Sequence, residues 1–324
     1  MERRDKFVSF DIVEDASDNY FCRRNDDVDR YSSLSKDGVY KAIMKEWKIL
    51  EQNLPDSIYV RVYESRFDLM RAVIVGAEGT PYHDGLFFFD IKFPFDYPNI
   101  PPRIHYHSLG FHINPNLYNN GAVCLSLLNT WHGSKSEKWD PTGSTILQLL
   151  LSIQGLVLNK RPFFNEPGLN LFSIPLQNKA RAYNCEVFAL MCRSSILLLR
   201  NPPKCFESFV EDHFRRRGLA VLLACNEYVN GRIAGYLNEK GSKVTKEFDR
   251  DIKLLYPLLL QELRDCNASL GIVAEQLQLE SVNEEKKNSG IFKRAMATIK
   301  KVLGLKNKGE KKEKIVTWYT PLPT

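Results

Sequence analysis

The chain has 324 residues, of which 44% are hydrophobic and 26% are charged, as in ordinary folded globular proteins. Its net charge of +6 is small for this length and suits an acidic protein partner as well as nucleic acid, so charge alone does not identify the partner. The seven cysteines are odd in number and form no CxxC pair, which argues against a disulfide framework and a zinc site. We find neither a signal-peptide core nor an apolar run of about 18 residues, so we expect a cytoplasmic or nuclear protein without a membrane-spanning helix.

The predicted elements begin after residues 1–35, a polar arm of mixed charge that we expect to be partly disordered. Apolar residues then recur at helical spacing over 37–53, which predicts an amphipathic helix. Four β-rich segments joined by turn residues predict a four-stranded antiparallel meander: 58–64, 69–77, 86–93 and 103–107. A helix followed by such a meander is typical of an α+β fold.

Residues 108–143 show little periodicity and predict a long loop, a feature that is often functional inside a compact domain. Further helices are predicted at 144–158, with Ser144 or Thr145 as the cap, and at 176–200, 204–230 and 244–278. We divide the chain into an arm (1–35), a main domain (36–203), a helical extension (204–280) and a basic tail (281–324).

A cysteine stands in this long loop, within the segment HINPNLYNNGAVCLSLL (112–128). A thiol is a good nucleophile near neutral pH and also a good leaving group, which suits an enzyme that receives an acyl group and passes it on. Asn116 lies eight residues before Cys124, and Gly121 lets the chain turn back between them. The Asn116 amide is therefore expected near a group bound to Cys124, where it would stabilise negative charge on a carbonyl oxygen.

Glu166, in the second loop (159–168), is the candidate for helping an attacking amine to lose its proton. Each of these residues also has an ordinary explanation when it is taken alone. A single cysteine is usually a small buried hydrophobe, asparagine is common in turns, and a loop glutamate is usually solvated. The functional interpretation therefore depends on the surrounding motifs.

Those motifs resemble the ubiquitin-conjugating enzyme family over roughly residues 38–200. FPFDYPNIPP (93–102) is similar to the family's FP-x-x-YP-x-x-PP signature, and NPNLYNNGAVC (114–124) is similar to its His-Pro-Asn motif that runs to the active-site cysteine. Trp139-Asp140-Pro141 resembles the Trp-x-Pro before the crossover helix, and Glu166-Pro167 stands where the family has an acidic residue and a proline.

The resemblance implies that Cys124 accepts ubiquitin from the activating enzyme as a thioester and passes it to substrate lysines. It implies that Asn116 stabilises the oxyanion and that Glu166, in place of the usual aspartate, orients or desolvates the lysine. The first helix would face the activating enzyme and ligases. No cofactor, metal or nucleic acid is implied.

Some positions depart from the family pattern. The motif's histidine is Asn114 here, and Asn99 replaces the hydrophobic ligase-docking residue of the proline loop. The segment between Cys124 and Trp139 is longer than in minimal members. The motifs GAEGTPYHDGLFFFDIKFP, INPNLY, CLSLLNTW, KWDP and FFNEPG resemble the large subgroup that includes the plant phosphate-homeostasis conjugating enzyme and the giant animal conjugating enzyme/ligases. Members of that subgroup often act without a separate ligase, so dependence on a ligase stays open.

Other interpretations are a catalytically silent module that binds ubiquitin or a partner, and a carrier of another ubiquitin-like modifier. His83, His105, His107 and His112 also invite a metal site or a cysteine protease, but no spacing assigns a base to Cys124. The tail at 290–305 is amphipathic and basic, and we favour a solubilising role for it over peripheral contact with an anionic membrane.

Overall fold

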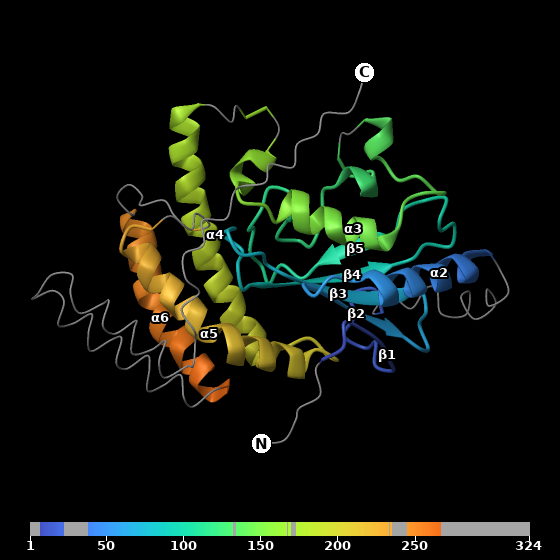
Figure 1. Cartoon of the computed structure of the whole chain (residues 1–324), viewed down its shortest axis with the longest axis horizontal. Coiled ribbons are helices and arrows are strands. Elements are labelled where there is room, and N and C mark those ends of the chain that lie inside the picture. The colour runs from blue at the N-terminus through green and yellow to red at the C-terminus, as the bar shows by residue number, and fades with distance from the viewer. Residues whose placement is uncertain are drawn as a thin grey trace, which may run out of the picture. The chain divides into compact units, whose positions relative to one another are not determined.

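The computed structural model describes residues 7–22, 38–131, 134–166, 168–169, 173–232, 234 and 245–266, all within one compact unit, Met1–Leu270. The predicted tail at 281–324 and the last part of the predicted helix at 244–278 lie outside the described residues. Figure 1 shows the main elements, in the order β1 (Phe10–Val13), α2 (Gly38–Asn53), β2 (Ile58–Tyr63), β3 (Leu69–Val75), β4 (Leu86–Lys92), β5 (Arg103–Tyr106), α3 (Ile146–Ser152), α4 (Ile174–Arg200), α5 (Glu207–Val229) and α6 (Lys246–Cys266).

The sheet has five strands in the order β1-β2-β3-β4-β5. Strands β2 to β5 form the antiparallel meander that the sequence predicted. The fifth strand, β1, comes from the arm and pairs in parallel with β2, with Phe10 opposite Val60. The sequence analysis missed it because the segment has only four residues and its partner lies far along the chain, where no local pattern reveals the pairing. The α+β class is confirmed, with a mixed sheet.

One face of the sheet packs against α2 and α3 to form the main core. Alternate strand residues such as Val60, Ala72 and Phe89 are completely buried there, as the two-residue period of a strand requires. Each fully buried large aliphatic or aromatic side chain contributes about 1.5–3 kcal/mol. This packing holds the ends of β5 and α3, and hence the loop between them, on a rigid base.

Helix α3 begins where the sequence predicted, because Thr145 caps it. The Thr145 side chain accepts from the Gln148 backbone N–H, and the Gln148 side chain accepts from the Thr145 backbone N–H. The predicted helix at 144–158 is not regular to its end, since a π-helical turn replaces the α-helix at Ile153–Val157. Such turns are frequent at functional sites.

The opposite face of the sheet is covered by the arm and by the start of α5. Phe206 packs edge-on against Phe88 of β4, and Phe209 lies 4.4 Å from Tyr59 of β2 between ring centres. Arg71 of β3 is fully buried beneath the arm, where it pairs with Asp18 and Asp90. The chain's own segments therefore occupy this face.

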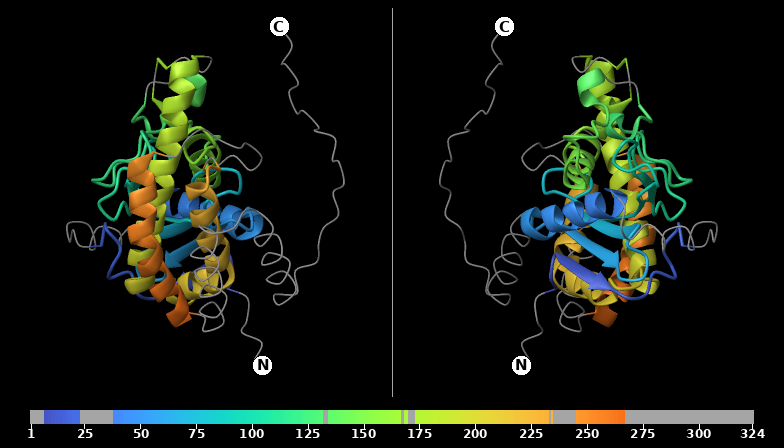
Figure 2. Two further views of the ribbon diagram at one scale, coloured as in Figure 1. Left: turned by 90° about the vertical axis from the view of Figure 1, so that its left-hand side faces the viewer. Right: turned by 90° about the vertical axis from the view of Figure 1, so that its right-hand side faces the viewer.

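Helix α4 is long and apolar enough to cross a membrane by composition, which the sequence analysis did not anticipate. However, 56% of its most apolar stretch is buried inside the protein. It packs beside α6, as both views in Figure 2 show, and a buried contact between Gly218 of α5 and Leu263 of α6 completes the group. The apolar surface of α4 is thus explained by helix packing.

Candidate active site

Cys124 lies half-buried on a loop that is folded back on itself. Its backbone N–H donates to the carbonyl of Asn116 (2.9 Å), and Leu117 forms bridges with Asn114 and Val123. Gly121 has a φ of 86° and lies directly against the His105 ring, because a Cβ there would come within 2.0 Å of that ring. Only glycine fits both constraints, so the sequence analysis placed this turn correctly.

Thr130 holds the chain on both sides of the cysteine. Its hydroxyl donates to the carbonyl of Val123 (2.8 Å) and accepts from the backbone N–H of Leu125 (2.9 Å). These two hydrogen bonds bracket Cys124 and fix the backbone from which its thiol projects. The sequence gave no signal for this role, because an exposed threonine in a loop is common.

The structure brings Asn116 to Cys124. The Asn116 side-chain amide donates to the backbone carbonyl of Cys124 (3.0 Å), and the residue is 8% exposed. An amide NH₂ group has two hydrogens. One hydrogen therefore supports the loop, and the other is the candidate donor to an oxygen bound near the sulfur.

Asn114, which stands at the position of the family's histidine, is fully buried and bonds four neighbours. Its amide donates to the Tyr82 hydroxyl and to the carbonyl of Val157, both at 2.7 Å. Its oxygen accepts from the backbone N–H of Asn116 (2.8 Å) and from the Asn165 amide (3.2 Å). It therefore ties the cysteine loop to the π turn of α3.

Tyr118 is a site residue that the sequence analysis missed. The Cys124 thiol lies close enough to its hydroxyl to raise the pKa of Tyr118. The His112 ring stacks on the Tyr118 ring at 5.6 Å between centres. Its position two residues after Asn116 in the quoted motif was the one available signal.

Glu166 lies exposed just after the short 3-10 helix η5 (Pro162–Asn165). Within the described part of the chain, no hydrogen bond or ion pair joins it to Cys124 or Asn116. Its charge nevertheless helps to raise the pKa of Tyr118 and of Tyr183, so it acts on the same region. The geometry places Glu166 at the edge of the site.

The four histidines have separate partners. His83 pairs with Asp84, His105 stacks on Tyr20, His107 bonds Asp90, and His112 stacks on Tyr118. Among the residues that the structure describes, no group of three or more metal-ligating side chains is placed to hold an ion. The imidazoles thus have packing and hydrogen-bonding roles.

Comparison with known proteins gives the family of this chain. The profile described as "Ubiquitin-conjugating enzyme" matches residues 42–189. The "Putative ubiquitin-conjugating enzyme E2 38" of Arabidopsis thaliana is 50% identical over 237 residues, which cover 72% of this chain and 72% of that relative. The chain belongs to the ubiquitin-conjugating enzyme family.

Two further relatives are much longer than the aligned region. The "Probable ubiquitin-conjugating enzyme E2 25" of Arabidopsis thaliana is 53% identical over 71% of this chain, which spans 38% of that relative. The human "Dual E2 ubiquitin-conjugating enzyme/E3 ubiquitin-protein ligase BIRC6" is 39% identical over 58% of this chain and 4% of its own length. The expected resemblance to the plant enzymes and to the giant hybrid enzymes is thereby confirmed.

Proposed function

We propose that this protein accepts ubiquitin from the activating enzyme as a thioester on Cys124 and transfers it to lysines of acceptor proteins. The observation that carries the proposal is the bond between the Asn116 amide and the Cys124 carbonyl at 3.0 Å, on a loop fixed by Thr130 and Asn114. This arrangement holds the thiol that would carry the acyl group beside an amide that can donate to the carbonyl oxygen of the thioester.

The transfer is a simple acyl exchange. The lysine amine attacks the thioester carbonyl, and the Asn116 amide stabilises the oxyanion that forms. The carbon–sulfur bond then breaks, an amide bond remains, and the Cys124 sulfur leaves as a thiolate. The amine proton passes to solvent, with the Glu166 carboxylate at the edge of the site favouring its departure. The Tyr118 hydroxyl lies beside the sulfur, where it can donate to the departing thiolate.

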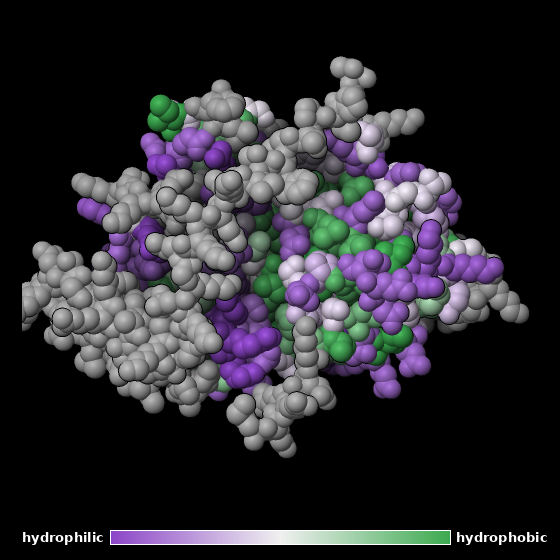
Figure 3. All heavy atoms as spheres, viewed as in Figure 1, coloured by the Kyte–Doolittle hydropathy of each residue, from purple (hydrophilic) through white to green (hydrophobic). Residues whose placement is uncertain are grey.

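Two surfaces support the proposed partners. Helix α2 carries Lys41, Lys45 and Lys48 on an exposed face, which suits an acidic surface of the activating enzyme or a ligase. Hydrophobic surface shows over α3 in Figure 3, and Leu156 in the π turn that follows α3 is 65% exposed. We assign this apolar surface to the ubiquitin carried on Cys124, because exposed apolar patches mark interaction sites.

The use of a separate ligase is a finer part of the proposal. The hydrogen bond from the Trp139 indole to the carbonyl of Pro98 (2.7 Å) joins the proline loop to the loop of Pro141. Asn99 and Pro141 are both exposed there. A polar Asn99 weakens ordinary ligase docking, so we propose that the chain transfers ubiquitin to lysine without a separate ligase.

The test is a charging assay with ubiquitin, activating enzyme and ATP. The wild-type chain should form a ubiquitin adduct that a thiol reductant removes. Cys124→Ser should form an adduct that resists reduction, and Cys124→Ala should form none. If no adduct appears with the wild type, the carrier function is wrong, and non-covalent binding of ubiquitin alone would then indicate a silent module.

A parallel assay with activating enzymes for other ubiquitin-like modifiers separates the third interpretation. Charging by one of these enzymes in place of the ubiquitin-activating enzyme would show that the chain carries a different modifier. Transfer to free lysine without a ligase tests the autonomy, and an absolute requirement for a ligase would contradict it.

A further inference from the structure

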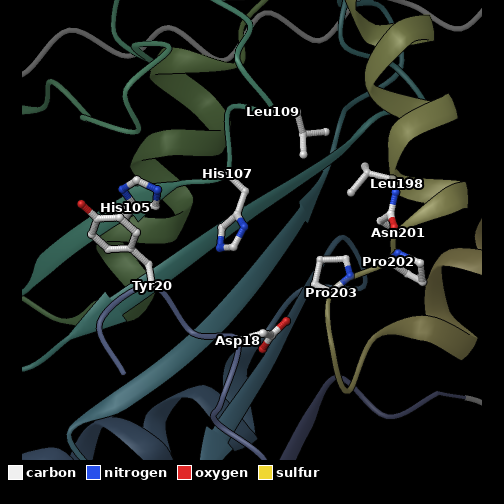
Figure 4. Close-up of a pocket in the computed structure, with 9 residues that line it drawn as sticks. All are labelled: Asp18, Tyr20, His105, His107, Leu109, Leu198, Asn201, Pro202 and Pro203. Carbon is white, nitrogen blue, oxygen red and sulfur yellow. The ribbon is translucent and has the colours of Figure 1, made fainter. Parts of the chain in front are cut away.

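A pocket of about 530 Å³ lies outside the cysteine site, on the face of the sheet that the arm covers. Its size is within the range of pockets that hold small ligands. Figure 4 shows that three segments meet around it: the arm, β5 with the turn that follows it, and the end of α4. The lining residues are Asp18, Tyr20, His105, His107, Leu109, Leu198, Asn201, Pro202 and Pro203.

The two sides of the pocket differ in chemistry. Leu109, Leu198 and the two prolines provide an apolar side, and Asp18 with His107 provides a polar side (Figure 4). Leu109 is 38% exposed and has a φ of 51°, a left-handed conformation that leucine rarely adopts. Backbone outliers of this kind persist where the surroundings hold them, often at binding sites.

The charges around the pocket favour a cation. Among the lining residues that the structure describes, none is a lysine or an arginine, and Asp18 is the one carboxylate. Asp18 and Asp90 share the guanidinium of Arg71, Asp90 also bonds His107, and the Asp18 side chain keeps 27% of its surface exposed. Asp18 also accepts from the backbone N–H of Lys204, whose ammonium group pairs with Asp15 and so is already compensated.

The imidazole of His105 adds no positive charge to the pocket. Burial, and then the neighbouring His107, lower the pKa of His105 to about 4, so its ring is neutral at physiological pH. That ring stacks on Tyr20 at 3.5 Å between centres. Tyr20 is partly exposed at the rim, and the face of a phenol ring attracts cations.

The pocket is joined directly to the cysteine loop. The His105 ring touches the backbone of Gly121, and the backbone N–H of Tyr106 donates to the carbonyl of Gly121 (2.8 Å). The Ser108 hydroxyl donates to the carbonyl of Asn119 (2.6 Å). An acceptor chain that presents a lysine to Cys124 thus has a second polar and apolar surface beside it.

We propose that this pocket binds a basic side chain of the acceptor protein, with its ammonium or guanidinium at Asp18 and its methylene stem against Leu109 and Leu198. The inference rests on the proposed function, since it names the acceptor that the same enzyme would select. It predicts a preference for lysines that have another basic residue nearby in the acceptor.

The probes are synthetic peptides with one acceptor lysine and an arginine placed two to six residues away, each matched by a peptide with glutamate in its place. The full chain is charged with ubiquitin, and the rate of ubiquitin transfer to each peptide is divided by the rate of transfer to free lysine. We expect the best arginine peptide to react at least about 5-fold faster than its glutamate match, as one close charge contact suggests. Equal rates at every spacing would overturn the proposal.

Variants test whether the preference for the arginine peptide arises in this pocket. Asn201→Lys places a cation at the exposed rim and should bring the arginine-to-glutamate ratio close to one. Leu109→Asn keeps the left-handed turn but removes the apolar wall, and should weaken binding of the arginine peptide. Gln261→Lys adds the same charge on the exposed face of α6 and should leave the ratio unchanged. An unchanged ratio in Asn201→Lys would contradict the assignment.

A binding assay separates the two proposals. Fluorescence anisotropy of labelled peptides with the uncharged chain measures the pocket without any transfer step. If no thioester forms but the arginine peptide binds and Asn201→Lys weakens it, the pocket is correct and the carrier function is wrong. If the thioester forms and neither assay distinguishes the peptides, the pocket is wrong and the carrier function stands.

Discussion

Asn116→Ala is expected to slow transfer to lysine far more than it slows charging of Cys124. The wild-type amide donates one hydrogen to the Cys124 carbonyl at 3.0 Å and has a second for the oxyanion. Loss of the loop hydrogen bond is worth about 1 kcal/mol, or roughly 5-fold, and should affect both steps. Loss of an oxyanion donor is worth about 2.7–4 kcal/mol, so transfer should fall by roughly 100-fold or more.

The assay is a single-turnover chase. The chain is charged, the activating enzyme is stopped, free lysine is added, and disappearance of the thioester is followed over time. Thr130→Val is the matched control, because it removes the hydrogen bonds of the Thr130 hydroxyl beside Cys124 without removing a donor to the oxyanion. If Asn116→Ala slows charging and transfer by the same factor, the amide only supports the loop and the reasoning is refuted.

Four further predictions follow from the same contacts. Thr130→Val should slow charging and transfer alike by roughly 5-fold while Thr130→Ser stays near wild type, and a wild-type rate in the valine variant would show that the hydroxyl is dispensable. Glu166→Ala should slow transfer to lysine by a few-fold, with the defect shrinking at high pH where free lysine deprotonates itself, so a pH-independent loss would indicate a structural role. Asn114→Ala should lower the free energy of unfolding in urea by about 2–3 kcal/mol, because buried partners such as the Val157 carbonyl lose their bonds, and a change below about 0.5 kcal/mol would contradict this. Stability should also fall in acid. Burial alone would raise the pKa of Asp90, but the bonds from His107 and Arg71 outweigh it and lower the pKa to about 2. The folded state therefore binds this proton less readily than the unfolded chain, and about 2 kcal/mol of stability that is present above pH 4 should be lost between about pH 4 and 2. Asp90→Asn should flatten that part of the stability profile measured by urea unfolding, and an unchanged slope would exclude Asp90 as its source.

The arm contributes to the stability of the domain. The sheet face opposite α3 is closed by residues of the arm, by Phe206 just before α5 and by Phe209 in α5. Because Asp18 of the arm is one of the two carboxylates that pair with the buried Arg71, removal of the arm would take away one partner of this guanidinium and uncover the Arg71–Asp90 pair. Loss of a partner from a buried ion pair is strongly destabilising, so the arm is a structural part of the domain.

Local sequence determined the helices and strands of the main domain. The alternation in IYVRVY, the cap at Thr145 and the apolar stripe after it needed no knowledge of the fold, because each depends on neighbours within a few residues. The motif around Cys124 also indicated the chemistry, since the spacing to Asn116 and the glycine between them are local features. Local sequence did not predict the π turn at the end of α3, because its Val157 carbonyl accepts hydrogen bonds from the side chains of Asn114 and Asn165 in other loops.

Tertiary structure decided the rest, because the deciding contacts join residues that are far apart in the sequence. The Asn114 side chain is hydrogen bonded in the core because the fold brings Tyr82 and Val157 to it. The Tyr118 hydroxyl lies close to the Cys124 sulfur because the loop folds back on itself. β1 found its partner in β2 about 50 residues away, and the arm brought Asp18 to Arg71. Sequence periodicity reports which side of an element is apolar, whereas the pairing of buried polar groups depends on distances that only the folded chain sets.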